Sequence, residues 1–390
     1  MRNRRRKKDT PVPLIPILLT LAAAAVTLNA ALRNIDVIGQ AGEQAAIASA
    51  VLTMPDAGLD LILERFRSLV LGEEGTAPDA AYQHPWPPPQ VMDQNPPGLM
   101  PETRDDEQEG VQGRAPPRIP ARYSAPVISE DFSGYDDGNW VKWRGAFILN
   151  ETSHSDEDIL SILETPWGAV LGDTSEPQVL IVHTHATESF ESHDRDAYDI
   201  RNTWRSTDNS INITAVGAEV ARVLEENGVT ALHDTTQHDY PSYNGSYNRA
   251  ANTIEDYLRQ YPSIKIVLDI HRDAMPRGDA IVKPVAVVEG EKAAQIMLIS
   301  SSDNGTVGVP EWRENLRFAA LLHDYMESRY PGLARPVYLC YRKYNMDLTT
   351  GSLLMEVGSN ANTLEEALHS ARMAGQALSD LIWDLTQYDE

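Results

Sequence analysis

Cysteine is almost absent from this sequence of 390 residues, which contains a single one, Cys340. One thiol rules out a disulfide framework and any structural zinc site built from several cysteines. Basic side chains are also scarce: 33 lysines and arginines stand against 57 acidic residues, a net charge of −24. Because a phosphate backbone selects basic surfaces, this balance argues against nucleic acid as a partner.

The charge is unevenly distributed along the chain. Residues 1–10 carry a net charge of +5, so residues 11–390 carry −29. The segment 11–32 is apolar apart from three residues. About 20 apolar residues span a membrane as a helix, and preceding basic residues keep that end in the cytoplasm. We therefore expect a basic cytoplasmic tail, a single transmembrane helix over 11–32 and a catalytic domain outside the cytoplasm at the cell membrane. A cleavable signal peptide is the alternative.

Three segments separate this anchor from the expected catalytic domain. Residues 33–74 show helical spacing of apolar positions and predict a juxtamembrane helical segment. Residues 75–130 contain twelve of the 25 prolines and predict an extended linker. Residues 131–177 form a lead-in to the domain.

Residues 178–390 alternate apolar runs of strand length with longer amphipathic stretches. This alternation predicts an α/β fold of three layers, with a mostly parallel sheet and helices on both faces. The expected strands are 179–182, 229–232, 264–270, 280–288, 295–300, 337–340 and 353–357. The expected helices are 213–227, 247–260, 311–329 and 363–385.

Residues of the types that bind metals follow three of these strands. His183 and His185 end the first strand, His271 ends the third, and Glu356 ends a late one. The carboxyl ends of parallel strands share one edge of a sheet, where active sites lie. These side chains are therefore expected to converge.

Two imidazoles and a carboxylate suit a catalytic zinc ion, which takes three protein ligands and leaves a position for water. The spacing of His185 and Glu188 lets both point from one turn, and His271 would complete the site. Glu356 would be the general base. His183 is either a ligand or a partner that orients one.

The segment 233–247 is too polar and aromatic for an ordinary connection. Tyr243 and Asn244 are expected to bind sugar or peptide groups of a substrate. Arg249 would brace this loop or bind a substrate carboxylate, and Arg272 is also expected at the substrate.

Other chemistries lack their motifs. The sequence has no G-x-S-x-G elbow, no H-E-x-x-H and no glycine-rich phosphate loop after the first strand. Cys340 stands in an apolar stretch and is expected to be a core thiol.

Four motifs resemble the stage II sporulation protein P family, and the resemblance covers about residues 178–388. They are HTHATESF at 183–190, HDTTQHDYPSYNGSYNRAANTI at 233–254, VLDIHRDA at 267–274 and GSLLMEVGSNANTLEEAL at 351–368. The resemblance implies a membrane-anchored peptidoglycan hydrolase of the sporulating cell. It also implies cleavage of the amide between N-acetylmuramic acid and L-alanine, endopeptidase activity, and work during forespore engulfment with stage II sporulation proteins D and M.

The catalytic domain of that family is similar to the type-3 zinc amidases, which assigns roles to individual residues. His185 and His271 match the two histidine ligands, and Glu356 matches the catalytic glutamate. The third amidase ligand is a glutamate at the start of the first helix, which here falls near Asn212 and Ile213. Neither suits zinc, so Glu188 is the expected substitute.

Two other functions remain open from the sequence. A zinc peptidase similar to carboxypeptidases would use the same order of ligands on peptide bonds. A wall-binding scaffold without catalysis would not need His271 or Glu356.

Overall fold

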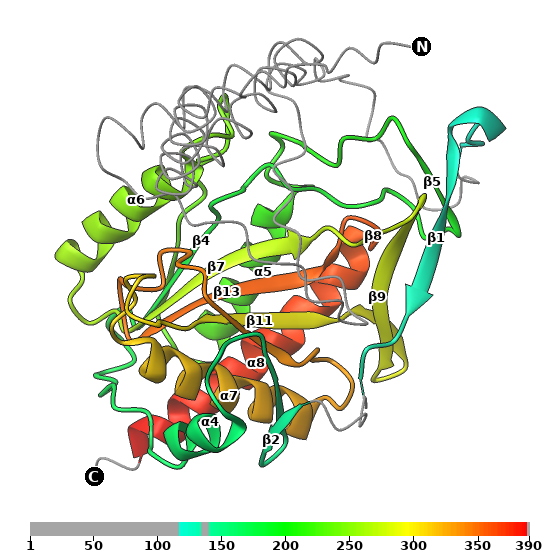
Figure 1. Ribbon diagram of the computed structural model, residues 1–390. Helices are drawn as coiled ribbons and strands as arrows, with labels where there is room; N and C mark the ends of the chain where they lie inside the picture. The colour runs from blue at the N-terminus through cyan, green and yellow to red at the C-terminus, as the bar shows by residue number, and fades with distance from the viewer. Residues whose placement is uncertain (1–116, 134–139, 388–390) are drawn as a thin grey trace, which may run out of the picture. The chain divides into compact units, whose positions relative to one another are not determined.

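The computed structural model describes residues 117–133 and 140–387 (Figure 1). The expected cytoplasmic tail, transmembrane helix, juxtamembrane segment and most of the proline-rich linker lie outside the described residues. Among the residues that the structure describes, no helix has the length and apolar character needed to cross a membrane.

An eight-stranded sheet forms the centre of the fold, in the order β2-β3-β12-β11-β13-β7-β4-β6. Its strands are β2 (Val141–Trp143), β3 (Ala146–Asn150), β4 (Val179–Val182), β6 (Ala231–His233), β7 (Ile266–Asp273), β11 (Ile296–Ser301), β12 (Val337–Cys340) and β13 (Gly351–Ser359). Most of them coincide with the apolar runs of the sequence. Long apolar runs are expected here, since a sheet covered on both faces has no polar side.

Neighbouring strands pair in parallel except at two places. β2 pairs antiparallel with β3, and β11 pairs antiparallel with β13. The prediction of a mostly parallel sheet is confirmed. The antiparallel pair nevertheless divides the sheet, because β11, β12 and β3 run opposite to β13, β7, β4 and β6.

Helices cover both faces of this sheet, as the sequence predicted. On one face α8 (Leu364–Gln387) packs between α5 (Ile213–Glu226) and α7 (Trp312–Arg329), and α4 (Asp156–Leu163) packs against α7. α6 (Ser246–Gln260) lies over β4 on the opposite face (Figure 1). The two faces follow from strand alternation, because Val179 and Ile181 join the large core whereas Leu180 and Val182 pack with Ile254 of α6.

A second, smaller sheet was not expected from the sequence. It has the order β10-β9-β1-β5, with β8 also paired to β9. Its strands are β1 (Ser124–Glu130), β5 (Ala197–Asp199), β8 (Pro276–Arg277), β9 (Ala280–Val288) and β10 (Glu291–Ala294). β1 and the short 3-10 helix η1 (Ala121–Tyr123) fall within the range assigned to the linker. β2, β3 and α4 fall within the lead-in, so the folded domain begins earlier than residue 178.

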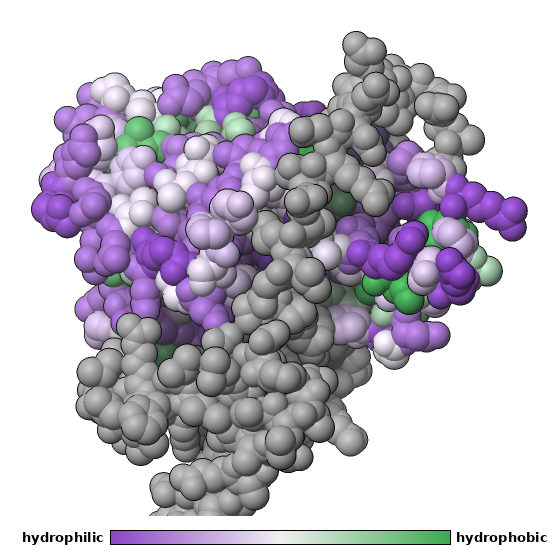
Figure 2. All heavy atoms as spheres, turned by 90° about the horizontal axis from the view of Figure 1, so that it is seen from above, coloured by the Kyte–Doolittle hydropathy of each residue, from purple (hydrophilic) through white to green (hydrophobic). Residues whose placement is uncertain are grey.

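The surface seen from above is mostly hydrophilic, with small hydrophobic areas (Figure 2). Few large apolar side chains are exposed in the described part of the chain: Ile128, Val170, Ile200, Tyr240, Val287 and Trp383. Cys340 is buried, as expected for a core thiol.

Candidate active site

The structure brings three of the predicted strand-end residues together. Glu356 of β13 is the register neighbour of His271 on β7, so both side chains point to the face that α6 covers. His185 follows β4, which pairs with the other edge of β7. The imidazole rings of His185 and His271 are 5.2 Å apart between centroids and nearly perpendicular. A single buried group therefore combines two histidines and a glutamate.

His271 lies between two carboxylates. Its Nε2 is 2.9 Å from Asp269 Oδ1, and its Nδ1 is 3.5 Å from Glu188 Oε2. Burial lowers the pKa of His271, but the charges of Asp269 and Glu188 outweigh burial and raise this pKa well above its ordinary value. The two carboxylates contact the ring from both sides, and a metal ion bound at Nδ1 would replace the proton on that nitrogen.

Asp269 is a site residue that the sequence reasoning missed. Its carboxylate accepts hydrogen bonds from the backbone N–H and the hydroxyl of Thr184, at 2.8 and 2.6 Å. It therefore ties the end of β4 to His271 on β7. A signal was present, because residues two apart on a strand share a face.

Glu188 is buried and held by two arginines. Its Oε1 is 3.7 Å from Arg205 Nη2 and 3.8 Å from Arg272 Nη1, and its Oε2 accepts the backbone N–H of Arg272 at 3.1 Å. Burial alone would raise the pKa of Glu188, but Arg272, His271 and Arg205 lower it instead. The side chain is thus a carboxylate that already faces His271.

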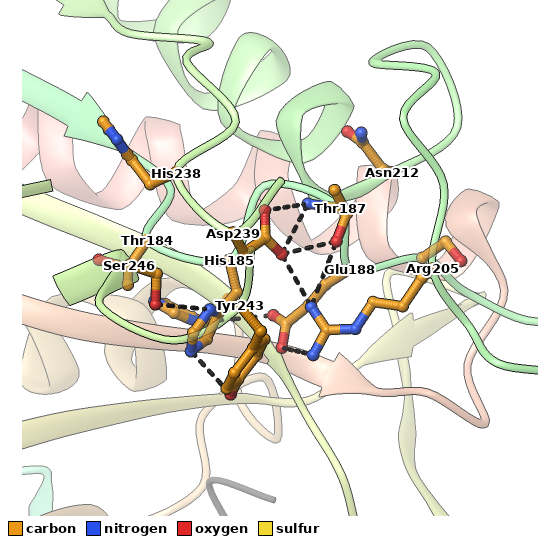
Figure 3. Close-up of polar contacts among 12 residues, drawn as sticks. Thr184, His185, Thr187, Glu188, Arg205, Asn212, His238, Asp239, Tyr243 and Ser246 are labelled. Atoms are coloured by element: carbon orange, nitrogen blue, oxygen red, sulfur yellow. Dashed lines mark hydrogen bonds and ion pairs between the residues drawn. The ribbon is translucent and has the colours of Figure 1, made fainter. Parts of the chain in front are cut away.

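Arg205 and Asp239 extend this network, and neither was expected from the sequence. Arg205 Nη1 donates to Asp239 Oδ2 at 2.9 Å, and the Thr187 hydroxyl donates to the same oxygen at 2.6 Å (Figure 3). The Arg205 guanidinium also lies over the ring of Tyr243, 5.3 Å from its centroid. Thr187, Arg205 and Asp239 come from three separate segments of the chain, so no local sequence pattern could have predicted their contact.

His185 contacts the loop before α6. Tyr243 stacks on its ring at 4.4 Å, with the phenol oxygen 3.0 Å from Nε2, and Ser246 Oγ is 3.5 Å from Nδ1 (Figure 3). Burial and the charge of His271 lower the pKa of His185 to about 3. A neutral imidazole is the form that binds a metal. Asn244, the next residue after Tyr243, is exposed.

Glu356 carries the clearest sign of a functional carboxyl group. It is 5% exposed, and within the described residues its Oε2 has no hydrogen-bond partner. Burial and the charge of Asp273 raise the pKa of Glu356 well above its usual value. Asp273 is itself paired with buried Arg335 at 2.9 Å. An unpaired buried carboxyl is costly, so it points to a group or substrate that completes it.

His183 points to the opposite face of the sheet. Its Nδ1 donates to the carbonyl of Ile270 at 2.8 Å, and its Nε2 lies 2.9 Å from Nε2 of His233. Because a carbonyl only accepts, Nδ1 carries the proton and Nε2 accepts from His233. Both ring nitrogens are therefore occupied by these contacts, which leaves His183 as a residue that holds the end of β7.

The two arginines expected at the substrate contact the backbone. Arg249 donates to the carbonyls of His238, Ser242 and Asn244. Arg272 donates to the carbonyls of Ser189 and Trp204, both at 3.1 Å. Of the two roles considered for Arg249, the contacts favour bracing the loop.

The start of α5 lies directly against Glu188. Asn212 caps this helix, accepting the N–H of Thr214 at 2.9 Å, and the N–H of Ile213 donates to the carbonyl of Glu188 at 2.7 Å. Asn212 contributes no contact to His185 or Glu188 in the close-up (Figure 3). The position implied for a third ligand and the substitute residue are thus neighbours in space.

The donor types of this group fit zinc. His271 Nδ1 and Glu188 Oε2 are 3.5 Å apart, which is about the spacing of adjacent ligands with bonds of about 2.0–2.2 Å. Within residues 117–133 and 140–387, however, no group of three His, Cys, Asp or Glu side chains has the arrangement needed to hold a metal ion. The chemistry of the site suits the metal, and His185 would have to leave Tyr243 to complete it.

A model of the family described as stage II sporulation protein P matches residues 141–379, more than half of the chain. The chain belongs to this family. The resemblance drawn from the sequence motifs is therefore confirmed, and the matched range includes β2, β3 and α4.

A curated relative supports the same family. Stage II sporulation protein P of Bacillus subtilis (strain 168) is 29% identical over 217 residues. The match covers 53% of this chain and 51% of the relative, so the chain spans about half the length of that protein.

Solved structures of amidases also align with this chain. The N-acetylmuramyl-L-alanine amidase Ami1 of Mycobacterium abscessus has a TM-score of 0.32 at 13% identity, covering 54% of this chain and 99% of that one. The amidase CwlD of Clostridioides difficile, solved with the lipoprotein GerS, has a TM-score of 0.36 at 9% identity, covering 54% and 100%. Similarity at this level supports no conclusion about activity.

Proposed function

We propose that this chain is a zinc-dependent peptidoglycan hydrolase that cleaves the amide between N-acetylmuramic acid and L-alanine, with endopeptidase activity on stem peptides. Family membership supports a role in sporulation. The single observation that carries the activity is the position of Glu356, which lies next to His271 on the neighbouring strand. Its buried carboxyl oxygen Oε2 has no hydrogen-bond partner in the described part of the chain. Such a carboxyl beside metal-binding imidazoles is suited to general base catalysis.

His185, Glu188 and His271 are the residues that would hold zinc. Bound there, the ion would polarise the scissile carbonyl and make a water molecule more acidic. Asp269 orients the imidazole of His271, and Arg205 and Arg272 keep Glu188 ionised and in place. Partners of this kind raise the affinity of metal ligands and fix their geometry.

The remaining residues of the candidate site would transfer protons, contact substrate or position the loops. Glu356 takes a proton from the attacking water and returns it to the leaving nitrogen. Tyr243, which stacks on His185, and the exposed Asn244 would contact the sugar or the stem peptide. Arg249 and Arg272 act on substrate indirectly, because they position the loops that carry these contacts.

The location and the partners of the protein rest on the sequence. The basic tail and the apolar segment 11–32 support anchoring in the cell membrane with the enzyme outside the cytoplasm. The family resemblance supports action with stage II sporulation proteins D and M in septal wall degradation and engulfment.

The test uses the full chain in detergent. Zinc is measured by atomic emission after dialysis, and peptidoglycan is digested with wild type, His271→Ala, Glu356→Gln and the control Glu365→Gln on the exposed face of α8. We expect wild type and control to bind zinc and to free the amino group of L-alanine. Glu356→Gln should keep zinc and lose about 10²–10⁴-fold in rate, whereas His271→Ala should lose zinc.

The products separate this function from its alternatives. A peptidase would free amino groups only within the stem peptide and leave the muramoyl amide intact. A scaffold would bind the wall without releasing peptides. Absence of zinc from wild type, or an undiminished rate in Glu356→Gln, would contradict the proposal.

A further inference from the structure

Tyr247 is a site residue without a role in the chemistry described above. It lies in the first turn of α6, and its ring is only partly exposed. Its hydroxyl is buried and has no hydrogen-bond partner among residues 117–133 and 140–387. Leaving a buried hydroxyl without a partner is unfavourable, because the hydroxyl has lost its hydrogen bonds to water. Native structures rarely keep such a group without a use for it.

The ring of Tyr247 packs on both histidines of the site. Its centroid is 5.4 Å from that of His185 in an edge-to-face contact and 6.5 Å from that of His271, with those two rings nearly parallel. A tyrosine phenol is a hydrogen-bond donor at neutral pH. The Tyr247 phenol also lies within electrostatic range of Glu356, the carboxyl group proposed as general base.

The backbone of Tyr247 is fixed from two sides. Gly245, with a φ of 79°, begins α6 in the left-handed region that glycine adopts without strain. From the loop between β12 and β13, Asn345 Nδ2 donates to the carbonyl of Tyr247 at 2.9 Å. Tyr344 and Asn345 have φ values of 43° and 56°, a left-handed conformation that is uncommon for tyrosine and that asparagine adopts more readily. The surrounding structure thus holds a constrained loop against Tyr247.

Tyr243 makes a useful comparison because it is the other phenol beside His185. The Tyr243 oxygen is 3.0 Å from His185 Nε2, so its hydrogen-bonding capacity is already directed at a protein group. The hydroxyl of Tyr247 has no such contact in the described part of the chain. Tyr243 is in addition assigned to the sugar or the stem peptide, whereas Tyr247 packs on both histidines and has no other role, so Tyr247 is the phenol considered for the scissile carbonyl.

We propose that Tyr247 is a catalytic residue that donates a hydrogen bond to the carbonyl oxygen of the scissile amide. This assignment rests on the proposed amide hydrolysis. As the water oxygen bonds to the carbonyl carbon, the π electrons of the C=O bond move to its oxygen, and negative charge grows there. Glu356 accepts the water proton and delivers it to nitrogen as the C–N bond breaks. Tyr247 keeps its own proton throughout and stabilises the developing charge.

The experiment removes the hydroxyl and keeps the ring. Tyr247→Phe is compared in the full-length protein with Tyr257→Phe, a control on the same helix whose hydroxyl donates to Asp234 at 3.2 Å. Three quantities are measured: kcat and KM on a soluble N-acetylmuramoyl peptide, the affinity for a tetrahedral phosphinate analogue of the muramoyl–alanine bond, and bound zinc.

We expect Tyr247→Phe to lower kcat about 10²-fold, the effect of losing one donor to an oxyanion. KM, zinc content and the unfolding midpoint should stay at the values of wild type, whereas affinity for the phosphinate should fall by a factor similar to that of kcat. A purely structural role would lower stability or zinc content and would not separate kcat from KM. Tyr257→Phe should match wild type in all measurements.

The outcomes distinguish this inference from the proposed function. If wild type hydrolyses the amide and Tyr247→Phe keeps its rate and analogue affinity, the role of Tyr247 is wrong and the function stands. If wild type binds the phosphinate without hydrolysis and Tyr247→Phe weakens that binding, the hydrogen bond is supported and the amidase activity is contradicted. If wild type neither hydrolyses the amide nor binds the phosphinate, both the proposed function and the role of Tyr247 are contradicted.

Discussion

His323 on α7 shows how burial sets the charge of a single residue in this fold. Its side chain is 1% exposed and meets the ring of Phe147 edge-on at 6.5 Å. Burial lowers the pKa of His323 to about 4, and nearby backbone carbonyls oppose this only in part. In the unfolded chain the same imidazole titrates near pH 6.5. The folded protein therefore keeps His323 neutral over a range in which the unfolded chain binds a proton.

Stability should consequently fall in mild acid because of this residue. The contribution of His323 is fully present above about pH 6.5 and is lost as the pH falls toward 4, since the unfolded state then binds the extra proton. The loss at pH 4.5 is roughly 2–3 kcal/mol. We predict that His323→Leu loses less stability than wild type between pH 7.5 and 4.5, measured by urea unfolding.

The partly exposed His193 provides the matched control, and His193→Leu should follow the acid response of wild type. An equal loss of stability in wild type and His323→Leu would show that His323 does not contribute to acid sensitivity.

At the same scale, part of the candidate site could be predicted from the sequence. His185, His271 and Glu356 each follow an apolar run, and the carboxyl ends of neighbouring parallel strands meet. Arg205 and Asp239 come from irregular segments whose position depends on long-range contacts, so no local pattern indicates them. The face of the sheet to which the His183 side chain points depends on where β4 ends. Strand boundaries are the least reliable part of a sequence prediction.

Among the elements, the contact between α5 and the edge of the sheet depends on one glycine. A Cβ atom at Gly217 would lie 2.4 Å from Nε2 of His183 and 2.9 Å from Nε2 of His233. These two imidazoles, buried His183 and half-buried His233, join the end of β4 to β6 and, through the carbonyl of Ile270, to β7. The helix can approach the pair this closely only because Gly217 has no side chain.

We predict that Gly217→Ala destabilises the protein although alanine is the better helix former. Helix propensity alone would favour alanine by about 1 kcal/mol, whereas overpacking a buried site costs about 1–3 kcal/mol. The exposed neighbour Ala218 supplies the control, since Ala218→Gly should cost about 1 kcal/mol with the histidine pair intact. Thermal unfolding measures both variants, and a stabilised Gly217→Ala would contradict the close packing of this contact.

Element types were easier to predict than strand directions. Helices and buried strands follow from periodicity and length, and β4 and β12 match their expected ranges. An apolar run does not encode the direction of its strand, so the antiparallel pairing of β11 with β13 could not be seen. β1 follows a proline-rich stretch and is mostly exposed, which gave it the appearance of linker.

For the whole molecule, the distribution of charge is the feature that composition alone conceals. The +5 of residues 1–10 stands before the apolar segment 11–32, and the rest of the chain is strongly acidic. If the proposed function holds, this acidic chain is not attracted electrostatically to a wall polymer that carries phosphate and carboxylate groups. Under that proposal, substrate binding would depend on the contacts of the active site and on the expected membrane anchor.

This leads to a prediction about orientation. Basic residues beside a membrane segment keep their end in the cytoplasm, whereas acidic residues contribute little to topology. Replacing the six arginines and lysines of residues 1–10 by serine should therefore lower the fraction of protein whose catalytic domain is exposed to protease added to intact spheroplasts. Deleting residues 1–32 should move the protein from the membrane to the soluble fraction.

The control replaces Arg118 and Arg122, which lie far from the apolar segment in sequence, and should leave protease exposure as in wild type. Unchanged exposure after removal of all six basic residues would contradict their role in setting orientation, and a membrane-bound product of the deletion would place the anchor elsewhere in the chain.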